Sequence, residues 1–313
     1  MDLYHLGPVG WVESQSIYHA LALLGREGLI ICYPTTPYIC LGLHDDLDYE
    51  IDQPYCRERG IPLLRREIGG GVVYLDDRQL FFQLVLRQDN PLVPLRRHRF
   101  YEKFLQPAIS VYRDLGIAAE LKEPADIAAG GRKFSGNGSG DIGCCVAYVG
   151  NILLDFDFVT MSRALKVPDE TYRRHLYRTM RANIVTLADC LECPVEYSPL
   201  AAGLIAGFQK QLGDLSPREP DAELRETARR VGERLTSREW LGLPGRRPAG
   251  RKVKIAEGVY LLAQGSVGQG RNAILVRDGI AKEIMAGNEA MELGMKFNER
   301  GQKDAKGEDG DPR

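Results

Sequence analysis

The spacing of apolar residues predicts both helices and strands from the start of the chain. Between Gly10 and Arg26 the apolar positions recur at helical spacing, which predicts an amphipathic helix. Two apolar runs follow, Leu29–Tyr33 and Tyr38–Leu43, and the proline-containing turn between them favours two strands of one sheet. Further strands are expected at Ile61–Arg65, Val72–Tyr74, Gln79–Leu86, Ala118–Lys122 and Cys144–Leu154. Further helices are expected at Tyr49–Arg59, Arg99–Leu115, Val159–Leu165 and through most of Ala201–Trp240.

A segment rich in glycine, proline and arginine, Gly242–Gly250, indicates a domain boundary. The mixture of strands and helices before it predicts an α+β domain over residues 1–245, and residues 250–298 are expected to form a small α/β domain. Strand regions of this second domain are expected at Lys252–Ala263 and Ala273–Glu283. Residues 299–313 hold nine charges and no large apolar side chain, which predicts a flexible tail.

The composition argues against several classes of protein. The chain has 313 residues, 44% of them hydrophobic, and a formal net charge of −2, so it can bury a core but has no excess of positive charge for nucleic acid. Its apolar runs are far shorter than the roughly 20 residues that span a bilayer, and no secretory signal is recognisable. Seven cysteines at irregular spacing argue against a disulfide framework, so we expect a cytoplasmic protein.

The first candidate site is the segment RREIGGGVVYLDD, residues 65–77. The glycines Gly69, Gly70 and Gly71 allow positive φ and let backbone N–H groups approach a ligand without a Cβ in the way. Such a turn favours a carboxylate or a phosphate, and Arg66 beside it offers a bidentate positive group. A solvated β-turn is the simpler alternative. The segment matches neither the P-loop nor the dinucleotide-binding fingerprint.

The second candidate site is PADIAAGGRKFSGNG, residues 124–138, which we expect to be a glycine-rich loop. Lys133 among these glycines can reach a phosphate or a carbonyl and neutralise the charge that develops during acyl-phosphate chemistry. An exposed loop lysine is the simpler alternative. Two separate glycine-rich basic segments are together more informative, because they can form complementary halves of a site for a carboxylic acid and a nucleotide.

These segments, in this order, resemble the lipoate-protein ligase family, which is related to biotin ligases and octanoyltransferases. The resemblance rests on RREIGGGVVYLDD with FFQLVL after it, on PADIAAGGRKFSGNGSG, and on AYVGNILLDFDFVTMSRAL, and it covers roughly residues 10–245. It implies a mixed β-sheet flanked by helices, with a lipoyl tunnel beside the three glycines. It also implies two steps, in which ATP with Mg2+ activates lipoate to lipoyl-adenylate and a lysine of a lipoyl carrier domain then attacks this anhydride.

The resemblance also implies roles for individual residues. Lys133 is the catalytic lysine that bridges the acyl carbonyl and the α-phosphate, and Asp126 and Gly136 lie with it at the nucleotide. The lipoyl, carboxyl and phosphate groups are implied to contact Arg66, Gly69, Gly70, Gly71, Tyr74 and Ser135. No bound resident metal is implied. Residues after Gly250 resemble, more weakly, the accessory domain of lipoate ligases, with 242–250 as a hinge, and we expect the protein to be a monomer.

The sequence departs from the family pattern at two places, and other functions stay open. Leu75 stands where the family usually has His, and RQLFF at 78–82 replaces GNLNF, so substrate preference, lipoate or octanoate, is not determined. An ATP-independent octanoyl or lipoyl transferase would need a cysteine nucleophile, and no cysteine lies between Cys56 and Cys144. A non-catalytic protein that binds lipoyl domains is a further alternative. The arginine-rich stretch Tyr172–Arg181 is either a solvated face or a docking surface for an acidic carrier.

Overall fold

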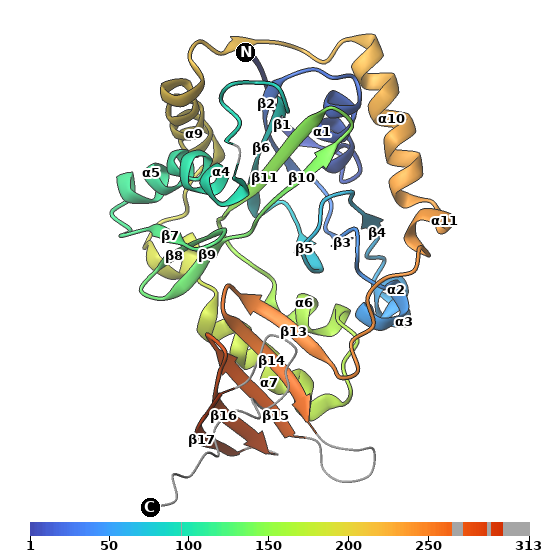
Figure 1. Ribbon diagram of the computed structural model, residues 1–313, viewed down its shortest axis with the longest axis vertical. Coiled ribbons are helices and arrows are strands. Elements are labelled where there is room, and N and C mark those ends of the chain that lie inside the picture. The colour runs from blue at the N-terminus through green and yellow to red at the C-terminus, as the bar shows by residue number, and fades with distance from the viewer. Residues whose placement is uncertain (95, 265–271, 287–288, 297–313) are drawn as a thin grey trace, which may run out of the picture. The chain divides into compact units, whose positions relative to one another are not determined.

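The structure is a computed structural model that describes residues 1–94, 96–264, 272–286 and 289–296 (Figure 1). The chain divides into two compact units. The first combines Met1–Lys166 with Val185–Arg247, and the second combines Val167–Ile184 with Pro248–Arg313. Each unit is therefore made from two separate stretches of the chain.

The first unit is built on a six-stranded mixed sheet with the strand order β10-β11-β6-β2-β1-β12 (Figure 1). The strands are β1 (Asp2–Val9), β2 (Gly28–Pro34), β6 (Gln79–Arg87), β10 (Asn137–Ile142), β11 (Cys145–Leu153) and β12 (Ser216–Pro217). β1 pairs in parallel with β2 and β12, and the remaining pairs are antiparallel. The mixed sheet with flanking helices confirms the predicted fold class, although β1 was not expected from the sequence.

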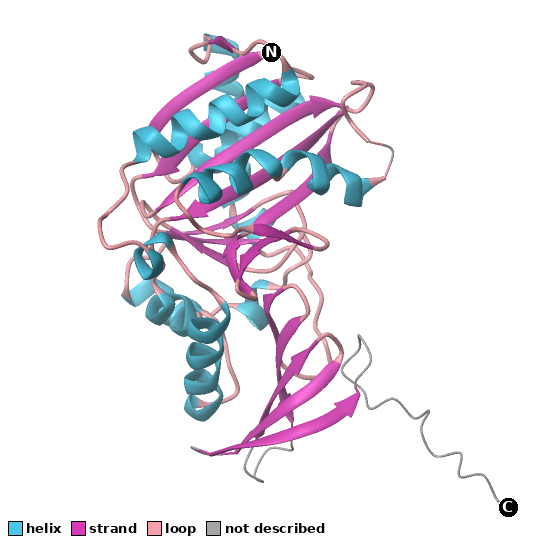
Figure 2. Cartoon of the chain, turned by 90° about the vertical axis from the view of Figure 1, so that its left-hand side faces the viewer, coloured by secondary structure: helices cyan, strands magenta, loops and turns pink. Residues whose placement is uncertain are grey.

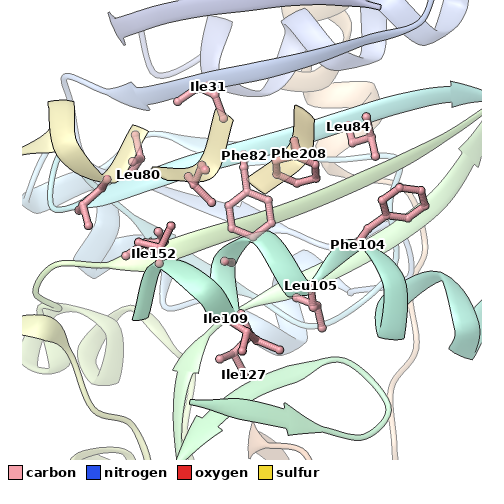
Figure 3. Close-up of a cluster of buried hydrophobic side chains, with 14 of the residues drawn as sticks. Ile31, Leu80, Phe82, Leu84, Phe104, Leu105, Ile109, Ile127, Ile152 and Phe208 are labelled. Atoms are coloured by element: carbon pink, nitrogen blue, oxygen red, sulfur yellow. The ribbon is translucent and has the colours of Figure 1, made fainter. Parts of the chain in front are cut away.

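The central strand β6 carries apolar side chains on both faces of this sheet. Leu80, Phe82 and Leu84 point into a buried cluster with helices α4 (Arg97–Phe104), α5 (Gln106–Asp114) and α9 (Tyr197–Leu212). In this cluster Phe82 lies near Phe208 of α9, with ring centroids 6.0 Å apart (Figure 3). Phe81 and Val85 point into the opposite cluster with α1 (Glu13–Leu23) and α10 (Ala222–Thr236). Burial on both faces explains why the sequence of β6 is a nearly continuous apolar run.

Two three-stranded sheets carry the segments that the sequence singled out. One has the order β4-β3-β5, and the other has the order β7-β8-β9. Their strands are β3 (Tyr38–Leu41), β4 (Leu63–Arg65), β5 (Val73–Leu75), β7 (Glu120–Lys122), β8 (Asp126–Ala129) and β9 (Arg132–Ser135). The prediction that Leu29–Tyr33 and Tyr38–Leu43 share one sheet is wrong, because β2 pairs with β1 and β6 whereas β3 pairs with β4 and β5.

The glycine-rich segment around Lys133 is also more regular than expected. It forms a hairpin of β8 and β9, followed directly by β10, instead of a loop. The turn between β8 and β9 is Gly130–Gly131, in which both residues have positive φ (55° and 74°). Two central residues with positive φ are what a two-residue type I′ hairpin turn requires, so the glycine pair itself encodes the hairpin.

Short helices complete the first unit. They are α2 (Leu47–Glu50), α3 (Gln53–Glu58), α6 (Phe158–Ala164), α8 (Leu187–Cys190) and α11 (Arg238–Leu241). The single helices predicted at Tyr49–Arg59 and Arg99–Leu115 are each two helices in the structure. Figure 2 shows helices lying along the strands of the large sheet. No helix among the described residues is long and apolar enough to cross a membrane.

The second unit is an antiparallel sheet packed against one helix. The sheet has the order β13-β14-β15-β16-β17, and the helix is α7 (Glu170–Asn183). The strands are β13 (Lys252–Ala256), β14 (Val259–Gln264), β15 (Asn272–Arg277), β16 (Ile280–Ala286) and β17 (Glu289–Lys296). The buried side of α7 includes Tyr172, whose hydroxyl donates to the carbonyl of Leu261 at 2.8 Å.

The unit boundaries differ from the expected domain boundaries in two respects. The helix of the small unit, at 170–183, comes from within the segment that the sequence assigned to the large domain. Residues 242–247 of the predicted hinge belong to the first unit, where the buried Arg65 donates to the carbonyls of Leu241 and Leu243. The predicted charged tail, 299–313, lies outside the described residues.

Candidate active site

The loop Gly69–Gly71 lies between β4 and β5, and the buried Arg66 fixes its shape. Arg66 Nη2 donates to the carbonyls of Gly69 and Gly71 at 3.0 and 2.9 Å, and Nη1 donates to the carbonyl of Cys40 at 3.2 Å. Arg66 is only 8% exposed. Arg66 therefore differs from the expected ligand-binding fork, because its guanidinium already holds the protein's own backbone.

The backbone of this loop approaches the backbone at Gly42 so closely that both Gly42 and Gly70 must be glycine. Gly70 has a φ of +99°, and a Cβ on Gly42 would lie 2.1 Å from the carbonyl oxygen of Gly70. Positive φ strains other residues, and no side-chain atom fits at 2.1 Å. At Gly69 and Gly71, in contrast, a Cβ would meet no atom within 4 Å. Open space on that side of the loop is compatible with a ligand close to the backbone.

His19 supports the start of the same loop from helix α1. Its Nδ1 lies 2.7 Å from the carbonyl of Gln15 and must donate, so the neutral Nε2 accepts the N–H of Glu67 at 3.1 Å. Complete burial lowers the pKa of His19 from 6.5 to about 3, so the ring stays neutral at physiological pH. His19 is a packing residue whose two ring nitrogens hold the backbone before the three glycines.

Lys133 and Asp126 are brought together by the β8–β9 hairpin. Lys133 Nζ lies 2.7 Å from Asp126 Oδ1, and the side chains are 20% and 4% exposed. Both were predicted as site residues, at the catalytic and the nucleotide position. The salt bridge places an ammonium group, partly open to solvent, beside a buried carboxylate, which is an arrangement suited to receiving a second anion.

Ser135 and Gly136, at the end of β9, both contact Asn151 of β11. The hydroxyl of Ser135 donates to the carbonyl of Asn151 at 2.5 Å, and the N–H of Gly136 donates to Asn151 Oδ1 at 2.8 Å. Ser135 is fully buried. The structure therefore gives both residues an internal hydrogen bond where the sequence suggested contact with substrate or nucleotide.

A chain of hydrogen bonds continues from Asn151 to the strand that follows the glycines. Asn151 Nδ2 donates to Gln79 Oε1 at 2.8 Å, and Gln79 Nε2 donates to the carbonyl of Tyr74 at 3.1 Å and to Asp76 Oδ1 at 3.2 Å. Arg78 Nε donates to Asp76 Oδ2 at 2.9 Å. The chain physically joins the two segments that the sequence proposed as halves of one site.

Burial shifts the titration of the groups at the β5 end of this chain. Burial raises the pKa of the Asp76 carboxyl, and the hydrogen bonds from Arg78 oppose that rise. Burial also raises the pKa of the Tyr74 hydroxyl, and the ring of Tyr74 lies edge-on to Phe156 with centroids 6.1 Å apart. Tyr74 is 5% exposed, so its predicted substrate contact would need a buried ligand.

Sequence reasoning missed Asp76, Gln79 and Asn151. The signal was present, because Gln79 and Asn151 are amides that begin or interrupt apolar strands, QLFFQLVL and VGNILL. A polar side chain inside a buried strand needs a hydrogen-bond partner. The partners lie 72 residues apart for Gln79 and Asn151, so no local pattern identifies the pair.

Four of the seven cysteines are buried and three are exposed. Cys32, Cys40, Cys56 and Cys145 are buried, whereas Cys144, Cys190 and Cys193 are exposed. Cys144 follows β10 at the opposite end from Asn137, and a strand from Asn137 to Ile142 spans about 17 Å. Burial and the neighbouring Cys144 raise the pKa of Cys145 to about 12, which disfavours a thiolate.

Cys190 is connected to the hairpin through its own helix. α8 begins two residues after Val185, whose N–H donates to the carbonyl of Lys133 at 2.9 Å, and Cys190 is the last residue of that helix. Burial raises the pKa of Cys190. Among the described residues no group of three or more His, Cys, Asp or Glu side chains is arranged to hold a metal ion.

Comparison with known families and sequences gives a consistent result. The profile described as the lipoyl protein ligase A/B catalytic domain matches residues 14–209. Lipoate-protein ligase LplJ of Bacillus subtilis (strain 168) is 29% identical over 181 residues, 58% of this chain and 52% of that protein. Octanoyltransferase LipM of Kyrpidia tusciae is 26% identical over 227 residues, 65% of this chain and 82% of that protein. The match therefore spans about half the length of the ligase and most of the transferase.

Two solved structures share the fold. A bi-partite lipoate protein ligase from Thermoplasma acidophilum, studied with its E2 lipoyl domain, superposes with a TM-score of 0.68 at 22% identity, over 79% of this chain and 98% of that one. A lipoate-protein ligase A bound with ATP superposes with a TM-score of 0.63 at 23% identity, over 77% of this chain and 98% of that one.

Proposed function

Because the chain belongs to the lipoyl protein ligase A/B catalytic-domain family, whose sequence relatives here include both lipoate ligases and octanoyltransferases, we propose that it is an ATP-dependent lipoate-protein ligase. The observation that carries the proposal is the Lys133–Asp126 pair on the β8–β9 hairpin, joined by hydrogen bonds to the strand after the three glycines. A partly exposed lysine beside oriented backbone groups suits a reaction between two anions.

The proposed reaction has two steps. In the first, a carboxylate oxygen of lipoate attacks the α-phosphorus of ATP, the bond to the β-phosphate oxygen breaks, and pyrophosphate leaves. Lys133 Nζ would lie between the acyl carbonyl and the α-phosphate and neutralise charge on both. In the second, the deprotonated ε-amine of a lysine on a lipoyl carrier domain attacks the acyl carbon, the acyl–phosphate C–O bond breaks, AMP leaves, and the nitrogen loses one proton to solvent to become the amide.

The geometry changes the roles proposed for the neighbouring residues. Gly69, Gly70 and Gly71 would line the acyl-adenylate through their open backbone, and Arg66 would act through them by holding two of their carbonyls. Ser135 and Gly136 would act by setting the backbone after Lys133. Asp126 would hold Lys133 Nζ until an anionic ligand arrives, and would then lie near the nucleotide.

Mg2+ would enter with the phosphates of ATP. Mg2+ in nucleotide sites is usually held by one or two carboxylates together with substrate phosphates and water, and Asp126 is a carboxylate at the proposed nucleotide position. The solved structures support ATP and lipoate as ligands, since a lipoate-protein ligase A is bound with ATP and a protein described as a putative lipoate protein ligase from T. acidophilum holds lipoic acid. We further propose a monomer that acts in the cytoplasm on a carrier domain.

An ATP-independent octanoyltransferase is the second candidate. This candidate is supported by the LipM transferases among the relatives, of which the chain covers 82% and 81% in two cases, close to the 77% of lipoate-protein ligase A subunit 1 of Thermoplasma acidophilum. It requires a cysteine that forms a thioester, and Cys144 and Cys145 are poorly placed for this role. Cys190, exposed and tethered to the Lys133 strand through α8, is the thiol to examine if the transferase is correct.

The deciding experiment is intact mass spectrometry of an apo lipoyl carrier domain after incubation with the protein and free lipoate, with and without ATP and Mg2+. A mass gain of one lipoyl group that requires ATP supports the ligase. No gain with ATP, together with octanoyl transfer from an octanoylated acyl carrier protein, supports the transferase. Binding of the carrier domain without either transfer would leave the non-catalytic alternative.

A further inference from the structure

We propose that Asn151, supported by Gln79 and Asp76, is a positioning residue that sets the backbone of the hairpin carrying Lys133. This inference rests on the proposed function, because it concerns the placement of Lys133 as the catalytic lysine. The positioning residues themselves touch neither substrate in the proposed site. Its structural basis is the hydrogen-bond chain from the N–H of Gly136 through Asn151 and Gln79 to the carboxylate of Asp76.

The two ends of the chain fix the orientation of both amides. The N–H of Gly136 can only donate, so the atom of Asn151 that faces it is Oδ1, at 2.8 Å. The amino group of Asn151 must then face Gln79 Oε1, also at 2.8 Å, and the amino group of Gln79 must face Asp76. An ionised Asp76 only accepts, and its other neighbours are N–H groups of Arg78. The chain therefore runs in one direction, because every amide and carboxylate oxygen in it faces only N–H groups.

Burial makes this direction costly to change. Gln79 is fully buried, Asp76 is 2% exposed and Asn151 is 8% exposed. Water has little access to replace a lost partner, and an unpaired buried polar group destabilises its surroundings. If either amide were reversed, a donor would face a donor or an acceptor would face an acceptor. The hydrogen bonds of the chain are therefore made together or lost together.

The hydrogen-bond chain affects Lys133 because Asn151 contacts the end of β9, the strand that carries Lys133. It does so with its backbone carbonyl and with its side chain. The Ser135 hydroxyl donates to the carbonyl of Asn151 while the Gly136 N–H donates to its side chain. The two preceding carbonyls are held by other segments: that of Lys133 by the N–H of Val185, and that of Phe134 by the hydroxyl of Tyr112 at 2.9 Å. Loss of the hydrogen bond to the Asn151 side chain would therefore leave the N–H of Gly136, at the end of segment 133–136, without its present partner.

The same chain reaches the glycine loop and the partner of Lys133. Gln79 Nε2 also donates to the carbonyl of Tyr74, in the strand after the three glycines. One residue beyond Gly136, Asn137 Nδ2 donates to the carbonyl of Ala125 at 2.9 Å, and Ala125 precedes Asp126. Lys133, its carboxylate partner and the glycine loop thus share one hydrogen-bonded framework, which explains how two segments distant in sequence can keep a fixed separation.

The test uses two single variants in the full chain, and each places acceptors face to face. In Asn151→Asp the second carboxylate oxygen faces Gln79 Oε1. Turning Gln79 over does not relieve this contact, because its oxygen would then face the carbonyl of Tyr74 and the carboxylate of Asp76. In Gln79→Glu the carboxylate oxygen that replaces Nε2 faces the same two acceptors.

We expect each single variant to lower kcat for pyrophosphate release from ATP and lipoate by about 10- to 100-fold, the cost of a displacement near 1 Å. KM for ATP and lipoate should change less than about threefold, because no ligand contact is removed. Gln83→Glu, four residues along the same strand and equally buried, is the control for general destabilisation, and it should keep kcat near wild type.

Wild-type kcat in Asn151→Asp or in Gln79→Glu would overturn the inference. If Asn151→Asp does not fold, Gln79→Glu gives the same kinetic measurement, and amide hydrogen exchange at Gly136 gives a second readout, with faster exchange expected in Gln79→Glu than in Gln83→Glu. If the wild-type chain releases no pyrophosphate, the proposed function fails. The hydrogen-bond chain is then judged by the exchange at Gly136 alone, so the two failures are distinguishable.

Discussion

A pH-dependent loss of stability is expected from the neutral imidazole of His19. The ring is fully buried, and its two nitrogens join the carbonyl of Gln15 to the N–H of Glu67 at the start of the glycine loop. Protonation would put a donor on Nε2 against the N–H of Glu67 and bury a charge without a partner. The perturbation to make is therefore a drop in pH, compared between the wild type and His19→Gln.

The magnitude follows from the pKa of His19, which burial lowers from 6.5 to about 3. Because the folded pKa lies below the unfolded one, the unfolded chain binds more protons below pH 6.5, and the stabilising contribution, complete above that pH, is lost as the pH falls towards 3. Linkage gives a loss of about 2 kcal/mol between pH 8 and pH 5 from this group alone. His19→Gln lacks the titration and should lose about 2 kcal/mol less over the same interval.

Urea unfolding followed by tryptophan fluorescence measures this difference. Both tryptophans, Trp11 and Trp240, lie in the first unit and pack against the cluster that contains α1, so the signal reports on the right part of the chain. The exposed His5 provides the matched control, and His5→Gln should keep the wild-type pH dependence. An equal loss of stability in the wild type and His19→Gln between pH 8 and pH 5 would refute the reasoning.

Three further predictions concern the proposed site and its nucleophile. Lys133→Met should abolish pyrophosphate release while circular dichroism shows a folded chain, and Asp126→Asn in the same background should recover some of the stability lost when the buried carboxylate loses its salt bridge to Lys133; release at the wild-type rate would remove the lysine from the mechanism. Gly42→Ala should displace Gly70, because its Cβ would lie 2.1 Å from that carbonyl oxygen, and raise KM for lipoate more than KM for ATP; unchanged constants would contradict the proposed place of the loop. Replacing all seven cysteines by serine or alanine should leave measurable ATP-dependent ligation by mass spectrometry, and complete loss in a folded variant would favour the thioester mechanism.

The sequence predicted the elements whose pattern is local. The first helix, the strand Gln79–Leu86 and the mixed fold follow from periodicity that a few turns or residues contain. The pairing of strands was less accessible, because a run such as Tyr38–Leu43 is equally apolar whether it joins the large sheet or a small one. Its partners, β4 and β5, are chosen by packing of segments that lie further along the chain.

The candidate site shows the same division. Lys133 and Asp126 were predicted as members of one site, and the structure places their charged atoms 2.7 Å apart. Arg66 was expected to face a ligand, yet it faces Cys40 and two carbonyls of the glycine loop. Residue type alone does not determine which of these acceptors an arginine meets, because the direction of a side chain depends on what the tertiary fold leaves room for.

By itself the sequence determined the family motifs, the glycine positions that permit close backbone approach, and the chemistry available at each residue. Only the tertiary structure decided how the polar groups are used. It turned Ser135 inward, joined Gln79 to Asn151 across 72 residues, and placed helix α7 with the C-terminal strands. The physical reason is that buried donors and acceptors must be paired, and their partners come from whichever segments the fold brings together, which sequence separation does not reveal.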